Sequence, residues 1–174
     1  MNKREYTTTE PKLYVLCGIP GSGKSYFAQQ MSDINNTLWV SRDEIRYKAL
    51  GGEDKVTLRN YFSKENQVKE QFFETINMCL KYGYNTIADA THLHPAARKE
   101  LLKRIYADHK ETIAVVFTTP YPVCKERNHT RTGIRVVPDD QLARMWRSFQ
   151  YPLLDEGFTH IYEVDEEGKV HPKY

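Results

Sequence analysis

Residues 18–25 of this 174-residue chain form a complete phosphate-binding loop. They read Gly-Ile-Pro-Gly-Ser-Gly-Lys-Ser, which matches the pattern G-x-x-x-x-G-K-[ST] at every fixed position. An apolar run at 13–17 precedes the loop, and a helix-like stretch at 26–31 follows it. The motif therefore stands between a strand and a helix, the context that its chemistry requires. We predict a site for a nucleoside triphosphate, built on a parallel α/β sheet.

The residue types of this loop predict the contacts that each makes. The glycines let backbone N–H groups turn toward phosphate oxygens, at a helix N-terminus that favours anions. Lys24 is expected to reach the β- and γ-phosphates, and the Ser25 hydroxyl is expected to ligate Mg²⁺. The residues expected to bind ATP from this segment are Gly18, Pro20, Gly21, Ser22, Gly23, Lys24, Ser25 and Tyr26.

Length and composition favour one domain over residues 1–174, with 1–11 as a polar tail. The net charge of +2 is too small to indicate a nucleic-acid partner by itself. Three cysteines show neither pairing nor metal spacing, so we expect reduced thiols in a cytoplasm. The N-terminus lacks the apolar region of a signal peptide, and no apolar run approaches membrane-spanning length, so no membrane partner is expected.

Strands alternate with helices along the chain, which predicts an α/β fold with a mostly parallel, five-stranded sheet flanked by helices. Ser63 is a candidate N-cap for a long helix that ends at Gly83, and 53–62 is expected to be a mobile loop. The expected strands are 12–17, 38–40, 86–88, 112–117 and 158–164. The other expected helices are 24–32, 42–49, one from Pro95, 121–131 and one from Pro138.

Residues 41–46, Ser-Arg-Asp-Glu-Ile-Arg, follow the second expected strand and face the same crevice as the loop. Asp43 is placed there to accept a hydroxyl proton while the acceptor oxygen attacks the γ-phosphate. Arg46 stands one helical turn further on and is able to hold a second anion. The alternative is an aspartate stabilised by a helix N-terminus beside a solvated arginine. Arg42 and Glu44 are expected to form salt bridges or to face solvent.

Residues 89–91, Asp-Ala-Thr, follow the third expected strand. A carboxylate at this point holds the water shell of Mg²⁺ in other phosphate-loop proteins. The alternative is that Asp89 caps a turn or pairs with Lys24. His92 and His94 lack a third metal ligand at plausible spacing, so we interpret them as polar loop residues near the acceptor.

A cationic segment lies between the fourth strand and Pro138, and it predicts the lid. Arg127 and Arg131 are four residues apart, hence on one face of the expected helix. Phosphoryl transfer needs positive charge on the migrating phosphate, which a closing lid supplies. The alternative is a solvated basic helix, and the role of Arg135 stays open.

With these segments placed, the chain resembles the 5′-hydroxyl polynucleotide kinases, both the kinase domain of the phage enzyme and that of bacterial RNA-repair end-healing enzymes. In that family the residue matching Asp43 is the general base, and the residue matching Arg46 grips the 3′-phosphate of the acceptor. Those matching Arg127 and Arg131 are lid arginines on the donor phosphates. The resemblance runs from Leu13 to Val164 and rests on the segments 18–25, 41–46, 89–91 and 124–131.

Motifs and resemblance together predict a P-loop kinase fold with an arginine-bearing lid. They also predict an ATP-dependent polynucleotide 5′-hydroxyl kinase acting on RNA or DNA ends, with Mg²⁺ as cofactor. The alternatives are a kinase of a small molecule or another RNA-linked hydroxyl, and a nucleotide-binding switch. The choice between ATP and GTP and the oligomeric state stay open. We expect catalytic roles for Asp43, Lys24, Arg127 and Arg131, acceptor contacts from Asp43, Arg46, Asp89 and Thr91, and metal contacts from Ser25 and Asp89.

Overall fold

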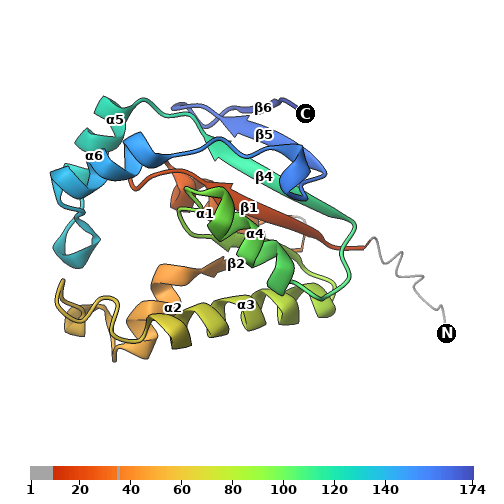
Figure 1. The fold of residues 1–174 in the computed structure, drawn as a ribbon, viewed down its shortest axis with the longest axis horizontal. Helices are drawn as coiled ribbons and strands as arrows, with labels where there is room; N and C mark the ends of the chain where they lie inside the picture. Colours follow the sequence, from red (N-terminus) through yellow and green to blue (C-terminus); the bar gives the residue numbers. More distant parts are fainter. Residues whose placement is uncertain (1–9, 35) are drawn as a thin grey trace.

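A mostly parallel sheet of six strands forms the centre of the computed structural model, which describes residues 10–34 and 36–174 (Figure 1). The strands stand in the order β2-β3-β1-β4-β5-β6, so β1 lies in the interior. Most of the predicted polar tail, residues 1–9, falls outside the described residues. The strands are β1 Lys12–Cys17, β2 Thr37–Ser41, β3 Asn85–Asp89, β4 Glu111–Phe117, β5 His160–Val164 and β6 Val170–Pro172.

Six α-helices and three short 3₁₀ helices connect the strands in the described part of the chain. This alternation confirms the predicted α/β fold. The α-helices are α1 Lys24–Ser32, α2 Arg42–Ala49, α3 Glu65–Lys81, α4 Pro95–Arg104, α5 Tyr121–His129 and α6 Asp139–Ser148. The 3₁₀ helices are η1 Glu53–Lys55, η2 Gly133–Arg135 and η3 Leu154–Glu156. None of the described helices has the length and apolar character that a membrane crossing requires.

The sheet has one strand more than the five predicted. Strand β6 runs antiparallel to β5, whereas β1 to β5 pair in parallel. Its three residues are all exposed, so they carry no apolar alternation that the sequence would reveal. A tight turn brings β6 back to β5: the N–H of Gly168 donates to the Asp165 carbonyl, and Gly168 takes a φ of +84°.

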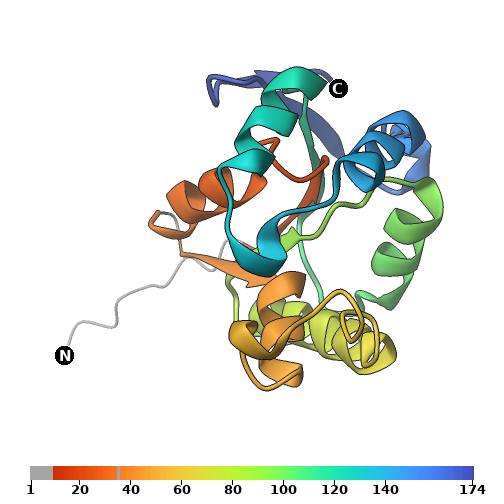
Figure 2. The same ribbon diagram turned by 90° about the vertical axis from the view of Figure 1, so that its left-hand side faces the viewer.

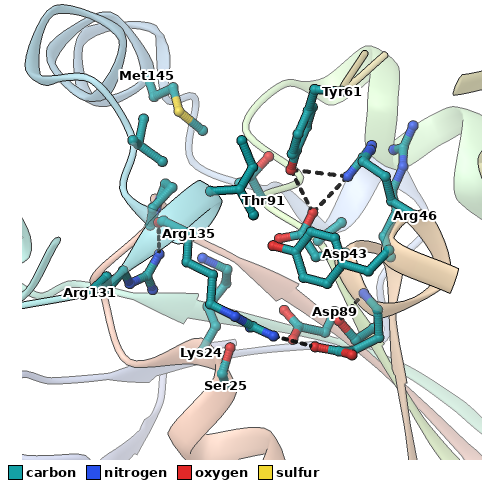
Figure 3. A pocket seen from close by; sticks show the side chains of 18 of the residues that line it. Lys24, Ser25, Asp43, Arg46, Tyr61, Asp89, Thr91, Arg131, Arg135 and Met145 are labelled. Carbon is teal, nitrogen blue, oxygen red and sulfur yellow. Dashed lines mark hydrogen bonds and ion pairs between the residues drawn. The ribbon is translucent and has the colours of Figure 1, made fainter. Parts of the chain in front are cut away.

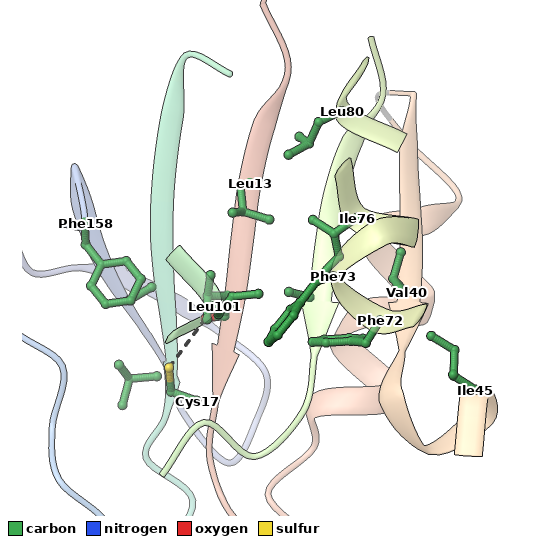
Figure 4. Packing of buried hydrophobic residues seen from close by; sticks show 14 of the residues in the cluster. Leu13, Cys17, Val40, Ile45, Phe72, Phe73, Ile76, Leu80, Leu101 and Phe158 are labelled. Carbon is green, nitrogen blue, oxygen red and sulfur yellow. Dashed lines mark hydrogen bonds between the residues drawn. The ribbon is translucent and has the colours of Figure 1, made fainter. Parts of the chain in front are cut away.

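Both faces of the sheet are covered, as a near-continuous apolar run such as β1 requires. One face packs against α3 and α4, and its buried side chains include Leu13, Val15 and Cys17 of β1 (Figure 4). Leu16 points to the opposite face, where Ala28 of α1 covers it. The apolar stripe predicted for α3 lies in the first of these clusters, with Val68, Phe72, Ile76 and Leu80 all buried.

The start of α3 differs from the prediction. Lys64, not Ser63, is the N-cap residue, and its side chain makes no capping hydrogen bond. The Lys64 ammonium instead donates to the carbonyl of Ala49 at the end of α2. Contact between α2 and α3 therefore fixes this helix start, and a local capping rule does not reveal such a contact.

The segment 53–62, predicted to be a mobile loop, does interrupt the helical pattern, but it carries its own hydrogen bonds. Asn60 accepts a hydrogen bond from the N–H of Thr57, and its side-chain amide donates to the carbonyl of Lys55. These contacts give the segment a defined path between α2 and α3. Tyr61, at its end, is thereby placed against α2.

The carboxyl ends of β1, β2 and β3 meet at one edge of the sheet, which faces the viewer in Figure 2. In the register of the sheet, Ser41 stands beside Asp89. The N–H of Gly18 donates to the carbonyl of Thr91 at 3.0 Å, which ties the phosphate-binding loop to the segment after β3. The three segments singled out in the sequence therefore converge here, as expected at the switch point of a parallel sheet.

Candidate active site

The phosphate-binding loop turns sharply between β1 and α1. Gly21 has a φ of +83°, and a Cβ added to it would stand 2.3 Å from the carbonyl oxygen of Cys124 on α5, so only glycine fits. Gly23, with a φ of +100°, is the N-cap of α1. The first backbone N–H groups of α1 have no partner within the helix, and they point out of its N-terminus, the end of a helix that attracts anions. This geometry suits a phosphate chain.

Lys24, the first residue of α1, is buried at the base of the loop. Its ammonium donates a hydrogen bond to the carbonyl oxygen of Ile19, 2.9 Å away, which folds the side chain back over the loop. Burial lowers the pKa of Lys24, and the negative charge of Asp89 opposes that shift. A bound triphosphate would bring further negative charge to this ammonium and favour its charged form.

Asp89 ends β3 and is buried. Trp39 on the neighbouring strand β2 donates its indole N–H to Asp89 Oδ2 at 2.9 Å. Burial raises the pKa of Asp89, while the charge of Lys24 and the Trp39 hydrogen bond act in the opposite direction. The carboxylate is therefore oriented from one side, by a residue that the sequence analysis did not single out.

A carboxylate and a hydroxyl from this region fit Mg²⁺. Ser25 and Asp89 line the same pocket, and both offer the oxygen ligands that Mg²⁺ prefers. In phosphoryl-transfer sites Mg²⁺ keeps several waters and takes only one or two protein groups beside the phosphates. Within residues 10–34 and 36–174 no cluster of three or more His, Cys, Asp or Glu side chains is suited to a metal. This site would thus hold the ion together with its nucleotide.

Asp43 reaches the pocket because α2 begins directly where β2 ends. The Ser41 hydroxyl accepts a hydrogen bond from the N–H of Glu44, which caps α2 at its first turn. Asp43 is consequently the second residue of the helix, and its side chain is 55% exposed. An acidic residue at this position also benefits from the helix N-terminus.

Asp43, Arg46, Tyr61 and Glu65 form a hydrogen-bonded cluster, part of which is the triangle of dashed lines in Figure 3. Arg46 Nη1 donates to Asp43 Oδ1 at 2.6 Å, and Arg46 Nη2 donates to Glu65 Oε2 at 2.7 Å. The Tyr61 hydroxyl donates to the same Asp43 oxygen at 2.8 Å and accepts from Arg46 Nη1 at 3.2 Å. Asp43 and Arg46 therefore lie on one face of α2, as expected from their spacing, and they also pair with each other, which the sequence did not predict.

One pocket of about 440 Å³ joins the phosphate-binding loop to this cluster. The predicted residues Gly18, Gly21, Ser22 and Gly23 are not among those that line the pocket, and neither are Tyr26, which is 68% exposed, and Arg127. Arg42 and Glu44 form salt bridges, as expected: Arg42 pairs with Glu65, and Glu44 pairs with Arg135. The predicted site residues that line the pocket are Pro20, Lys24, Ser25, Asp43, Arg46, Asp89, Thr91 and Arg131.

The two predicted lid arginines take separate positions. Helix α5 ends at His129, so Arg131 lies in the turn beyond it and not on a shared helix face. Arg131 lines the pocket, and burial lowers its pKa. Arg127 donates to the carbonyl of Glu166 at 2.9 Å and lies beside Gly23, whose added Cβ would stand 3.7 Å from Arg127 Nη1. Arg127 therefore lies beside the phosphate-binding loop at Gly23, whereas Arg131 lines the pocket together with Lys24 and Ser25.

Arg135, whose role the sequence left open, bridges the lid to α2 and η1. Its guanidinium donates to Glu53 at 2.7 Å and to Glu44 at 2.8 Å, and it lies over the ring of Tyr47, 5.0 Å from the centroid. Figure 2 shows the segment after α5 reaching down to α2. The pairs are partly exposed, so each stabilises the structure only weakly. They nevertheless fix where the segment after α5 meets α2 and η1.

The prediction for His92 was wrong. Its ring is buried, with Nδ1 2.7 Å from the carbonyl oxygen of Leu16 in β1, and it packs near Phe72. Burial lowers the pKa of His92 to about 4, so the ring is neutral near pH 7. His92 therefore contacts the backbone of β1, the strand that leads into the phosphate-binding loop. His94 is exposed and serves as the N-cap position of α4.

Three residues of the site carried no signal in the sequence analysis. They are Trp39, which contacts Asp89, and Tyr61 and Glu65, which contact Arg46; all three line the pocket. The two residues of each contact are 15 to 50 positions apart in the chain. Only the packing of β2 on β3 and of α3 on α2 brings them there. No short motif records such distances.

The fold and this site define a nucleotide-binding protein of the P-loop kinase type. A family model described as "AAA domain" matches residues 13–152, and the chain belongs to that family. The chain is also similar to a putative bifunctional polynucleotide kinase/RNA ligase of Autographa californica nuclear polyhedrosis virus. That protein is 22% identical over 175 residues, which cover 91% of this chain and 25% of the viral protein.

The chain is also similar to solved structures of kinases and of an RNA repair complex. A chain of the Pnkp1/Rnl/Hen1 RNA repair complex matches with a TM-score of 0.68 and 25% identity, covering 99% of this chain and 51% of its own. A sugar kinase from a Janibacter species matches with a TM-score of 0.65 and 17% identity, covering 91% and 87%. The chain thus spans a quarter of the viral relative and half of the repair-complex chain. The predicted resemblance and kinase fold are confirmed.

Proposed function

We propose that this chain is an ATP-dependent kinase that transfers the γ-phosphate to the 5′-hydroxyl end of RNA or DNA. The observation that carries the proposal is one pocket lined by Lys24 and Ser25 of the phosphate-binding loop and by Asp43 and Arg46 of α2. A phosphate donor at the first pair faces an acceptor at the second. Such positioning, with charge stabilisation, supplies most of the catalysis of phosphoryl transfer.

The acceptor hydroxyl gives its proton to Asp43 as its oxygen attacks the γ-phosphorus. Asp43 Oδ1 accepts hydrogen bonds from Arg46 and Tyr61, whereas no hydrogen bond to Oδ2 is found among the described residues. The Asp43 side chain is 55% exposed, so we assign the contact with the substrate to Oδ2. Lys24, Arg131 and Arg127 place positive charge on the phosphates of the donor. When bound, Mg²⁺ at Ser25 and Asp89 neutralises charge that develops on the β- and γ-phosphate oxygens.

The names of similar proteins support a polynucleotide as the acceptor. The viral relative is called a polynucleotide kinase/RNA ligase, and the matching solved chain belongs to an RNA repair complex. We infer that Arg46 and Thr91 contact the acceptor strand, since both line the pocket beside Asp43. Arginine suits a phosphate through charge-assisted, often bidentate hydrogen bonds.

The 3′-phosphate of the acceptor provides a test. A nucleic-acid end differs from a free nucleoside by the phosphate on its 3′ side, and a hydrogen bond to a charged group contributes about 1.5–3 kcal/mol. The wild-type chain should prefer a nucleoside 3′-monophosphate to the nucleoside by roughly ten- to a hundredfold in kcat/KM. In Arg46→Ala most of that preference should disappear, while the KM for ATP changes little.

Because Arg46 also contacts Asp43, its removal slows transfer to every acceptor. The ratio of the two specificity constants removes this common loss and isolates the contribution of the phosphate. A wild-type ratio close to one would contradict the polynucleotide proposal. It would favour a small-molecule acceptor, the alternative supported by the sugar kinase that matches along 87% of its own chain.

A further inference from the structure

Tyr61 lies at the end of the segment between η1 and α3, and its hydroxyl contacts the carboxylate that the proposed mechanism uses as a base. It donates to Asp43 Oδ1 at 2.8 Å, the same oxygen that accepts Arg46 Nη1. Two donors on one oxygen fix the plane and direction of the carboxylate more narrowly than one donor does. In Figure 3 the Tyr61 side chain projects toward Asp43 and Arg46 from outside α2.

The ring of Tyr61 is itself held in place. It lies over the Arg46 guanidinium, with 4.4 Å from the arginine carbon to the ring centroid, and it makes an edge contact with Phe62. The side chain of Arg46 is only 5% exposed and is anchored on its far side by Glu65. Burial, and the negative charge of Asp43, raise the pKa of the Tyr61 hydroxyl. The hydroxyl therefore remains a proton donor throughout the physiological pH range.

We propose that Tyr61 is a positioning residue for proton transfer: by holding Asp43 Oδ1, it keeps Oδ2 directed at the acceptor hydroxyl. This inference rests on the proposed function, because it assigns Asp43 the role of base. In the reaction the acceptor O–H proton passes to Asp43 Oδ2 while the acceptor oxygen forms a bond to the γ-phosphorus. The bond from that phosphorus to the bridging oxygen breaks, and its electron pair leaves with ADP.

The variant Tyr61→Phe removes the hydroxyl and keeps the ring over Arg46. We expect kcat to fall by roughly ten- to a hundredfold, the range of one hydrogen bond to a charged group. The KM for ATP should stay within about twofold of wild type, because the hydrogen bonds of the Tyr61 hydroxyl to described residues go to Asp43 and Arg46 and not to the phosphate-binding loop. The matched control is Tyr106→Phe, which removes a tyrosine hydroxyl bonded to Glu74, at 3.0 Å and on the surface, and should leave kcat unchanged.

A double-mutant cycle shows whether Tyr61 acts through Asp43. In an Asp43→Asn background no base remains to be oriented, so adding Tyr61→Phe should cost less than about twofold. An equal loss in both backgrounds would overturn the proposal, as would an unchanged kcat for Tyr61→Phe alone. A fall in melting temperature that accounts for the lost activity would also overturn it and make Tyr61 a structural residue.

The proposed function is checked separately, on the wild type alone. If it phosphorylates a 5′-hydroxyl oligonucleotide, the cycle is run with that acceptor. If it does not, the proposed acceptor is wrong, and the cycle is run on acceptor-free ATP hydrolysis, in which water takes the acceptor's place. The coupling between Tyr61 and Asp43 decides the inference in either case, with the same expected and contrary outcomes.

Discussion

Replacing Lys24 with alanine should abolish phosphoryl transfer and weaken binding of ATP. The ammonium is the buried cation at the base of the loop, 2.9 Å from the Ile19 carbonyl, and a bound triphosphate would place its β- and γ-phosphates there. Each charge-assisted hydrogen bond contributes about 1.5–3 kcal/mol, so two phosphate contacts account for roughly a hundredfold or more in binding and transfer.

The fold should survive this change. Burial lowers the pKa of Lys24, which means that the folded protein without nucleotide gains nothing from the charge. We expect Lys24→Ala, and the closer match in volume Lys24→Met, to keep a melting temperature near that of the wild type. The matched control is Lys64→Ala, because the Lys64 ammonium also donates to a backbone carbonyl, that of Ala49, but on the surface. Near-normal transfer by either Lys24 variant would contradict the assignment of the loop.

Replacing Asp43 with asparagine should lower kcat by roughly 10²–10⁴, the usual cost of losing a general base. The amide oxygen of asparagine still accepts hydrogen bonds from Arg46 and Tyr61, so the geometry of the cluster is preserved. Only the ability to take a proton is lost. Binding of ATP should therefore change little, because the nucleotide contacts that we propose belong to the phosphate-binding loop and to Arg127 and Arg131.

Asp140→Asn is a close control for this variant. Asp140 is the second residue of α6, as Asp43 is of α2, and it pairs with Arg144 one helical turn on. Its side chain is exposed to solvent, so we expect wild-type kinetics from the substitution. Equal losses of ATP binding and of transfer in Asp43→Asn would mark Asp43 as a structural residue and refute its role as the base.

The sequence predicted most of the fold because its signals are local. The phosphate-binding loop, the stripe of α3 and Pro95 at the start of α4 each depend on neighbours within a few residues. Asp43 and Asp89 were identified for the same reason, since each stands at or just beyond the carboxyl end of a strand in a parallel sheet.

The features that the sequence did not predict depend on contacts across the fold. Tyr61 is 18 positions from Asp43, and Trp39 is 50 positions from Asp89. In the sequence nothing distinguishes the Tyr61 hydroxyl and the Trp39 indole from those of other tyrosines and tryptophans. Their partners become adjacent only when α2, β2 and β3 pack together in the fold. The prediction for His92 was wrong for the same reason: it stands in a polar segment, yet its partner is the backbone of β1, 76 positions away.

The helix boundary at His129 separated the two lid arginines. A spacing of four places residues on one face only while the helix continues, and α5 ends between Arg127 and Arg131. The structure leaves Arg131 lining the pocket and Arg127 beside Gly23. The predicted end of this helix, residue 131, is two residues beyond the observed end at His129, and this difference places Arg131 outside the helix.

The most direct test of the account is whether the γ-phosphate reaches a nucleic-acid 5′-hydroxyl. The purified chain would be incubated with Mg²⁺, γ-labelled ATP and an equal mixture of three compounds, and the labelled products separated. The compounds are a 5′-hydroxyl oligonucleotide, its 5′-phosphorylated counterpart and gluconate, a sugar acid that represents the small-molecule alternative. We predict label on the 5′-hydroxyl oligonucleotide alone, with none from Asp43→Asn beyond about 1% of the wild-type rate. Label on gluconate, or hydrolysis of ATP that no hydroxyl compound accelerates, would contradict the account.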